Sequence, residues 1–277
     1  MKVSIFTFAA VITTLTYSND TSAQGQPSGR PDIKPEWTVS VGGGVLFNPT
    51  YVGDDDYQLS LLPNIRVAYG NSFFASVQEG VGYNVINQNG WRVGPLVKFD
   101  FGRDEGGNSP FRVIGSETND LDGFGQIDFT FEAGGFLQYA ARNFSSKLEL
   151  RRGINGHEGF VGEFEVNRTG RNTVFGKTGI FSFGPKLKFA NKRYNQAFFG
   201  VNAAQATGSG LAQYNAGSGV VSYGVSGSQI ILLSRNVSAV AFTGYDRLGH
   251  EASESTLIEQ RGSANQFSAG LFLSYSF

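Results

Sequence analysis

Apolar and polar side chains alternate with a period of two residues along much of the chain. Between Trp91 and Phe101, apolar residues occupy every second position, and Arg92, Lys98 and Asp100 lie on the other face. The same sorting recurs in segments that begin at Ile127, Phe144, Phe160 and Phe181. Successive side chains of a β-strand point to opposite faces, so the pattern predicts an all-β protein.

The alternation predicts twelve strands, with ten as an alternative count. The predicted segments are 36–47, 57–69, 72–85, 91–103, 124–140, 143–152, 159–167, 174–190, 194–204, 219–233, 236–247 and 265–277. One residue disagrees with this pattern, because Glu79 shares its parity with Val77 and Val81, which requires a bulge or a shift in register.

The C-terminus distinguishes a membrane barrel from a soluble sandwich, which would show the same alternation. From Phe267 to Phe277 one parity is apolar and the chain stops on phenylalanine, which resembles the closing strand of bacterial outer-membrane barrels. Aromatic residues also gather near predicted strand ends, as interfacial girdles require. We therefore expect a transmembrane, antiparallel, up-and-down β-barrel.

Charged residues on the inward parity are nearly balanced. They are Arg66, Arg92, Lys98, Lys147, Arg151, Lys186 and Lys188 against Asp100, Asp128, Glu132, Glu149, Glu163 and Glu165. Such balance predicts a polar lumen filled by cross-strand ion pairs, in place of a single-sign ring or a wide general porin.

Composition narrows the class of protein further. The 277 residues include 38 Gly, 25 Phe and no Cys, with 22 Lys and Arg against 23 Asp and Glu. The charge balance gives no basic footprint for nucleic acid, and the lack of Cys excludes disulfides, thiolate catalysis and Cys-zinc sites. Lys2, the apolar stretch that follows it and Ala23 predict a cleaved secretory signal over 1–23, which leaves 24–277 as the barrel domain.

Candidate chemistry is sparse. His157 and His250 are the imidazoles of the chain, and both fall in turn-like segments that predict exposed loop histidines in place of a Ser-His catalytic pair with Ser253 or Ser255. Asp54, Asp55 and Asp56 could bind a divalent cation, but a solvated turn is the favoured interpretation. We expect no enzyme activity and no cofactor.

Short motifs in a fixed order resemble a known family. They include Tyr51-x-Gly53 with Asp54 to Asp56 and Tyr57, then Gly94-Pro95, Gly156-His157-x-Gly159, Gly184-Pro185, Phe199-Gly200-Val201 and Tyr245-x-Arg247-Leu248. In this order they are similar to the MltA-interacting protein/OmpV family of Gram-negative outer-membrane proteins. The loop after Leu248 departs from the family pattern, which usually has Gly-Asp-Ala before Ser-Pro.

The resemblance implies a non-enzymatic scaffold in peptidoglycan synthesis and turnover, located in the outer membrane amid lipid and lipopolysaccharide. Its implied partners are a lytic transglycosylase and a peptidoglycan synthase; a narrow solute channel or a surface adhesin is the alternative. Alternation of the predicted strands places residues 104–123 and 153–158 in the periplasm, opposite 48–56. Within these two segments we expect partner contacts from Ser109, Phe111, Arg112, Ile114 and His157.

Overall fold

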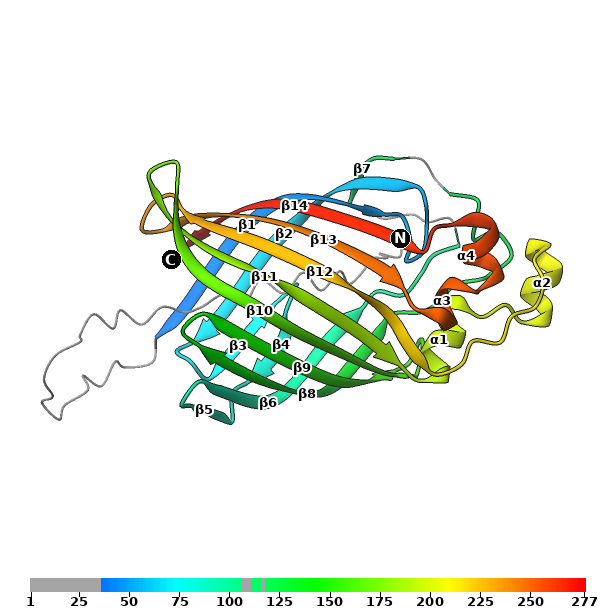
Figure 1. Ribbon diagram of the computed structural model, residues 1–277, viewed down its shortest axis with the longest axis horizontal. Helices are drawn as coiled ribbons and strands as arrows, with labels where there is room; N and C mark the ends of the chain where they lie inside the picture. Colours follow the sequence, from blue (N-terminus) through cyan, green and yellow to red (C-terminus); the bar gives the residue numbers. More distant parts are fainter. Residues whose placement is uncertain (1–35, 106–110, 116–117) are drawn as a thin grey trace, which may run out of the picture.

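The computed structural model describes residues 36–105, 111–115 and 118–277, and within them fourteen strands form one antiparallel sheet that closes into a barrel. Twelve strands build the wall (Figure 1). They are β1 (Trp37–Pro49), β2 (Tyr57–Tyr69), β3 (Phe73–Ser76), β4 (Gly80–Tyr83), β6 (Trp91–Asp100), β8 (Thr130–Ala141), β9 (Phe144–Ile154), β10 (Phe160–Val174), β11 (Lys177–Ala190), β12 (Gly219–Leu232), β13 (Val237–Leu248) and β14 (Asn265–Ser276). The predicted signal peptide lies outside the described residues.

The barrel closes because β1 pairs with β14 on one side and with β2 on the other. Two short strands add to the wall. β5 (Ile86–Gln88) pairs with β6, and β7 (Arg112–Ile114) pairs with Leu59 and Ser60 near the start of β2. The predicted twelve-stranded antiparallel barrel is confirmed.

The parity of the closing strand follows the sequence pattern. Leu271 and Leu273 on β14 face outward and are about half exposed, while Phe272 between them and Ser268 point inward and are buried. An outward apolar surface of this kind is what a barrel presents to hydrocarbon.

Two predicted strands are wrong. Segment 72–85 is a hairpin of two short strands, because residues 77–79 form a turn in which the Glu79 backbone N–H donates to Ser76 Oγ. The Glu79 carboxylate accepts from Arg66 at 3.0 Å, so the turn also explains the parity of Glu79. Gly80 continues this turn at φ +82, where a Cβ atom would lie 2.3 Å from the Val97 carbonyl oxygen.

Segment 194–204 is helical, not a strand. It contributes to α1 (Lys192–Phe199) and α2 (Ala203–Ser209), which begin after the capping side chains of Asn191 and Asn202. The remaining helices, α3 (His250–Ser253) and α4 (Thr256–Arg261), lie between β13 and β14. No helix in the described part of the chain is long and apolar enough to cross a bilayer.

The split hairpin changes the predicted sides of the barrel. All four helices, the 50–56 loop, the segment between β6 and β8, and the 155–159 turn lie at one end, called the loop end (Figure 1). Short turns, the start of β1 and the C-terminus lie at the other end, called the turn end. The prediction that 104–123 and 153–158 lie opposite 48–56 is therefore wrong, since one predicted strand is really two.

The hydrophobic core closes the loop end. It joins the 50–56 loop, the segment before β8, α1 and α4 through buried residues that include Tyr51, Leu121, Phe198, Phe199 and Leu257. The barrel interior below this cap combines charged residues with buried apolar side chains of the wall, among them Leu96, Phe136 and Phe272.

Candidate functional site

The barrel interior is crossed by ion pairs centred on Arg151 of β9. Its guanidinium donates to Glu132 on β8 and Glu163 on β10, each at 2.8 Å, and also to Glu149 on its own strand. The Arg151 side chain is 2% exposed. One cation therefore joins three neighbouring strands away from water.

Two lysines extend this network around the wall. Lys98 of β6 lies 2.7 Å from Glu149 and 3.6 Å from Glu163, and Lys147 lies 2.6 Å from the other oxygen of Glu149. We call these six residues the lumen network: Lys98, Glu132, Lys147, Glu149, Arg151 and Glu163. Opposite charges lie on the adjacent strands β6, β8, β9 and β10, so the network lines this side of the barrel interior with paired charges.

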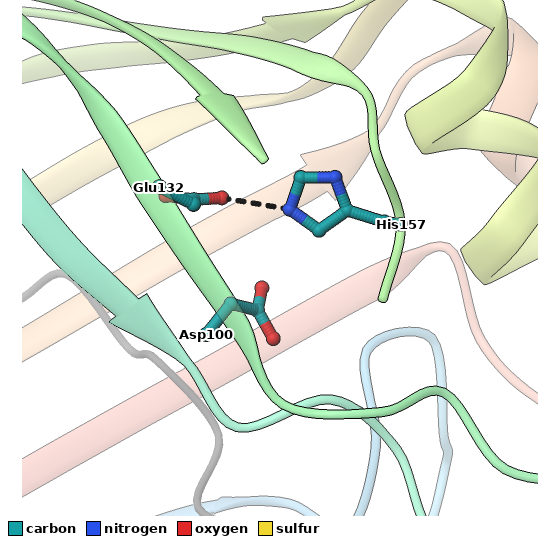
Figure 2. A group of neighbouring side chains, drawn as sticks. All are labelled: Asp100, Glu132 and His157. Carbon is teal, nitrogen blue, oxygen red and sulfur yellow. Dashed lines mark hydrogen bonds and ion pairs between the residues drawn. The ribbon is translucent and has the colours of Figure 1, made fainter. Parts of the chain in front are cut away.

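His157 links the lumen network to the cap. Figure 2 shows its ring bonded to Glu132 with Asp100 beside them. The Gly159 backbone N–H donates to Nδ1 at 3.0 Å, so the proton of the neutral ring is on Nε2, which donates to Glu132 Oε1 at 3.1 Å. The ring also packs edge-on against Tyr194 of α1, at 4.9 Å between centroids.

This geometry assigns His157 a structural role. Its residue surface is 3% exposed, so the prediction that it is an exposed loop histidine available to a partner is wrong. The ligand atoms of Asp100, Glu132 and His157 lie within 4.8 Å of one another. A metal ion there would have to displace the Gly159 N–H or the Nε2 proton, because both ring nitrogens already form hydrogen bonds.

A cavity of about 110 Å³, lined by both apolar and charged side chains, lies between the lumen network and the cap. Its wall includes Glu163, Glu165, Lys186, Asp246 and Gln266. Lys186 and Asp246 pair at 2.6 Å, so the cavity carries charges of both signs.

The other predicted site residues are dispersed. His250 is exposed and pairs with Glu254 at 2.7 Å, while Ser255 Oγ donates to the Phe199 carbonyl, so no Ser-His pair forms between them. Phe111 and β7, which contains Arg112 and Ile114, line the loop end of β2. Ser109 lies outside the described residues.

The acidic turn differs from its predicted solvated form. Asp54 is fully buried, whereas Asp55 and Asp56 are exposed. The residue that sequence reasoning missed is Asp120, whose carboxylate lies beside those of Asp54 and Asp55. Asp120 lies 65 residues after Asp55 and 66 after Asp54, and no local motif marks it.

The family model described as MltA-interacting protein MipA matches residues 41–277. Among curated proteins, no sequence gives a significant match.

Several solved barrels are similar in structure. An outer-membrane channel from Pseudomonas putida is 10% identical over 90% of this chain and 100% of its own, with a TM-score of 0.46. The NanC porin is 10% identical over 86% and 98%, with a TM-score of 0.39. Neisserial surface protein A is 11% identical over 87% and 97%, with a TM-score of 0.27.

Proposed function

We propose, from the premise that this chain belongs to the MltA-interacting protein family, that it is a non-enzymatic outer-membrane scaffold for cell-wall enzymes. The outward apolar wall supports a membrane location. The scaffold role is supported by the lumen network, which pairs the charges of β6, β8, β9 and β10, and by the hydrophobic cap, which packs buried apolar side chains across the loop end. Function is then left to the surfaces at the two ends.

A narrow channel is the second candidate, and the cavity under the cap, which charged side chains of both signs help to line, favours it. Reconstitution of the purified barrel in planar bilayers separates the two functions. We expect no stable, large conductance from the wild-type protein. A steady open level at neutral pH would refute the closed scaffold and support the channel.

The turn end offers the contact surface for a periplasmic partner, since barrels have short periplasmic turns and longer outer loops. The turns 70–72, 84–90, 142–143, 175–176 and 233–236 contain Arg142 and Arg235 and no acidic residue. A lytic transglycosylase, which the family description implies as partner, would meet these two arginines there, with the exposed Glu36 at the start of β1 on the same end. With the turn end in the periplasm, β7 at the loop end lies on the outer side of the membrane. We therefore place the periplasmic contact at the turn end in place of the predicted one at Phe111, Arg112 and Ile114.

The β10–β11 hairpin is the most prominent feature of that end. β10 pairs with β9 only as far as Arg168, and β11 meets β12 only from Gly179, so the residues between them extend beyond both neighbours. The side-chain amides of Asn172 and Gln229 bond each other reciprocally at 2.8 and 3.1 Å, which fixes the hairpin against β12.

Phe175, at the tip of the β10–β11 hairpin, lowers the stability of the barrel when no partner is bound. It is 96% exposed and has φ +50, followed by Gly176 at φ +73. Both central residues of a type I′ turn need positive φ, a conformation that suits Asn and costs a bulky residue about 1–3 kcal/mol. Burial of a phenylalanine side chain in a partner's apolar pocket contributes about 1.5–3 kcal/mol to binding. Phe175 is therefore an anchor for an apolar pocket with an acidic rim.

Replacement of Phe175 tests this contact. Phe175→Asn relieves the strained turn, so the barrel should keep or gain stability while it loses co-purification with the transglycosylase from envelope extracts. Thr173→Asn, at an exposed position of the same hairpin, is the matched control and should retain the partner. Equal recovery of the enzyme with Phe175→Asn and wild type would refute the anchor.

A further inference from the structure

Three carboxylates from two distant segments converge at the loop end. One ligand oxygen each of Asp54, Asp55 and Asp120 lies within 4.8 Å of the other two. Asp54 and Asp55 belong to the turn between β1 and β2, and Asp120 belongs to the segment that leads to β8. We call these residues the loop-end triad.

No basic side chain of the described residues pairs with the loop-end triad. Arg261 of α4, which lies alongside, donates instead to the backbone carbonyls of Asp120 and Ser209. Three like charges at this separation repel one another, and the repulsion increases away from water. Arg261 attracts the Asp120 carboxylate without contacting it, so the triad lacks the direct ion pair that buried carboxylates normally have.

Asp54 adds an independent observation. Its side chain is fully buried, Oδ1 accepts the Asp56 backbone N–H at 3.1 Å, and Oδ2 has no hydrogen-bond partner. A buried carboxylate oxygen without a partner is costly and rare in folded proteins. A ligand that binds carboxylate oxygen would remove that cost.

The electrostatics of the turn agree with this geometry. Burial, the largest cause, raises the pKa of Asp54 to about 7, with further increases from Asp120 and its neighbours in the turn that oppose the lowering effect of the Asp56 N–H. Burial likewise raises the pKa of Asp120. Both directions follow from the burial of carboxylates beside like charges.

We propose that the loop-end triad is a calcium site that joins the turn between β1 and β2 to the segment before β8. Three atoms no farther apart than 4.8 Å lie within about 2.8 Å of a common centre, close to the 2.3–2.6 Å of Ca²⁺–oxygen bonds. Hard divalent cations prefer such an all-oxygen set. Asp55 is exposed, which leaves one side of the ion to water.

The surrounding backbone holds the turn in place for this role. The Gly53 carbonyl accepts from the Ser263 N–H at 2.8 Å, and Gln266 bonds both the Gly53 N–H and the Asp54 carbonyl. These contacts fix Asp54 against the α4–β14 connection. The cation would then fix the segment that contains Asp120 to the same frame.

Calorimetric titration tests the site. The full barrel in detergent, freed of metal with EDTA, is titrated with CaCl2, and we expect one site with a dissociation constant of about 10⁻⁴–10⁻³ M, typical of extracellular calcium modules. Asp54→Asn and Asp120→Asn should each weaken binding by about tenfold or more, because each removes a charged ligand. MgCl2 should bind more weakly, since Mg²⁺ demands octahedral geometry and dehydrates reluctantly.

Asp122→Asn is the matched control, because it removes an equal charge from an exposed position of the same segment. It should change affinity by about twofold or less through screened long-range charge. Heat-modifiable gel migration verifies that each variant is folded, and the partly exposed Asp120 provides a second variant should Asp54→Asn misfold. No heat of binding in wild type, equal weakening by Asp122→Asn, or Mg²⁺ binding as tight as Ca²⁺ would overturn the calcium assignment.

Discussion

Replacement of Arg151 by methionine is the sharpest test of the lumen network. The substitution removes the one group among the described residues that contacts Glu132, Glu149 and Glu163 together, and it leaves these carboxylates with Lys98, Lys147 and His157 as partners. Removal of one member of a buried, hydrogen-bonded ion pair costs about 3–5 kcal/mol, because the other charge is left without compensation. We expect Arg151→Met to lower the free energy of unfolding by this amount.

The assay is urea unfolding of the barrel in lipid vesicles, followed by fluorescence of Trp37 and Trp91. Arg151→Lys should cost less, about 1–3 kcal/mol, because it keeps the charge but lacks the forked donors. Lys177→Met on the exposed hairpin should cost about 0.5 kcal/mol or less.

A rescue experiment separates stranded charge from lost packing. Adding Glu163→Gln to Arg151→Met should recover part of the lost stability, since the uncompensated carboxylate is neutralised. A loss below about 1 kcal/mol in Arg151→Met, or no recovery in the double variant, would refute the view that the lumen network stabilises a closed barrel.

Three further predictions address the wall, the orientation and the cap. Val97→Lys places a charge on the outward face of β6 and should lower the free energy of unfolding by about 2–4 kcal/mol, measured in the same vesicles. In intact cells, a membrane-impermeant maleimide should label Ala204→Cys on α2 and leave Thr178→Cys on the hairpin unlabelled; the reverse result would invert the barrel. Gly53→Ala should destabilise by about 1–3 kcal/mol, because Gly53 has φ +102 and a Cβ atom would lie 2.1 Å from Ile258 Cδ1; unchanged thermal migration on gels would contradict this.

The wall was predictable from sequence because its determinants are local. Outward and inward residues alternate on every long strand, and neighbours in sequence are neighbours in the sheet. Segment 72–85 resembles one long strand because the alternation continues on both sides of the turn at 77–79, and Glu79, the residue that breaks the pattern, is the sign of that turn. The strand prediction for 194–204 is wrong because Tyr194 and Phe198 fit the spacing of a strand as well as that of a helix. The residue that distinguishes the two is Asn191, whose side chain caps α1.

These two errors cancelled in the strand count but not in the sides of the barrel. One hairpin read as a strand reversed the predicted side of 104–123, and the helical segment read as a strand restored the alternation later in the chain. A strand count is therefore weaker evidence of topology than the order of turns.

The site was predictable only in part, because its contacts are distant in sequence. The inward charges of the lumen network could be assigned from parity alone. The burial of His157 depends on Glu132 and Tyr194, which lie on other elements, and a glycine-rich turn gives no sign of either. Asp120 likewise meets Asp54 only after the barrel closes.

The two proposed sites lie at opposite ends of a barrel with a closed interior, so they should act independently. Phe175 lies in the turn end and the loop-end triad lies in the cap, with the lumen network between them. A ligand can couple to a distant site only through an element with two arrangements, and the ion-paired wall offers none. In detergent, EDTA should therefore leave co-purification of the transglycosylase unchanged, while Phe175→Asn abolishes it with or without calcium. Loss of the partner on chelation would show that the cap and the turn end are coupled through the barrel, and would refute the rigid wall.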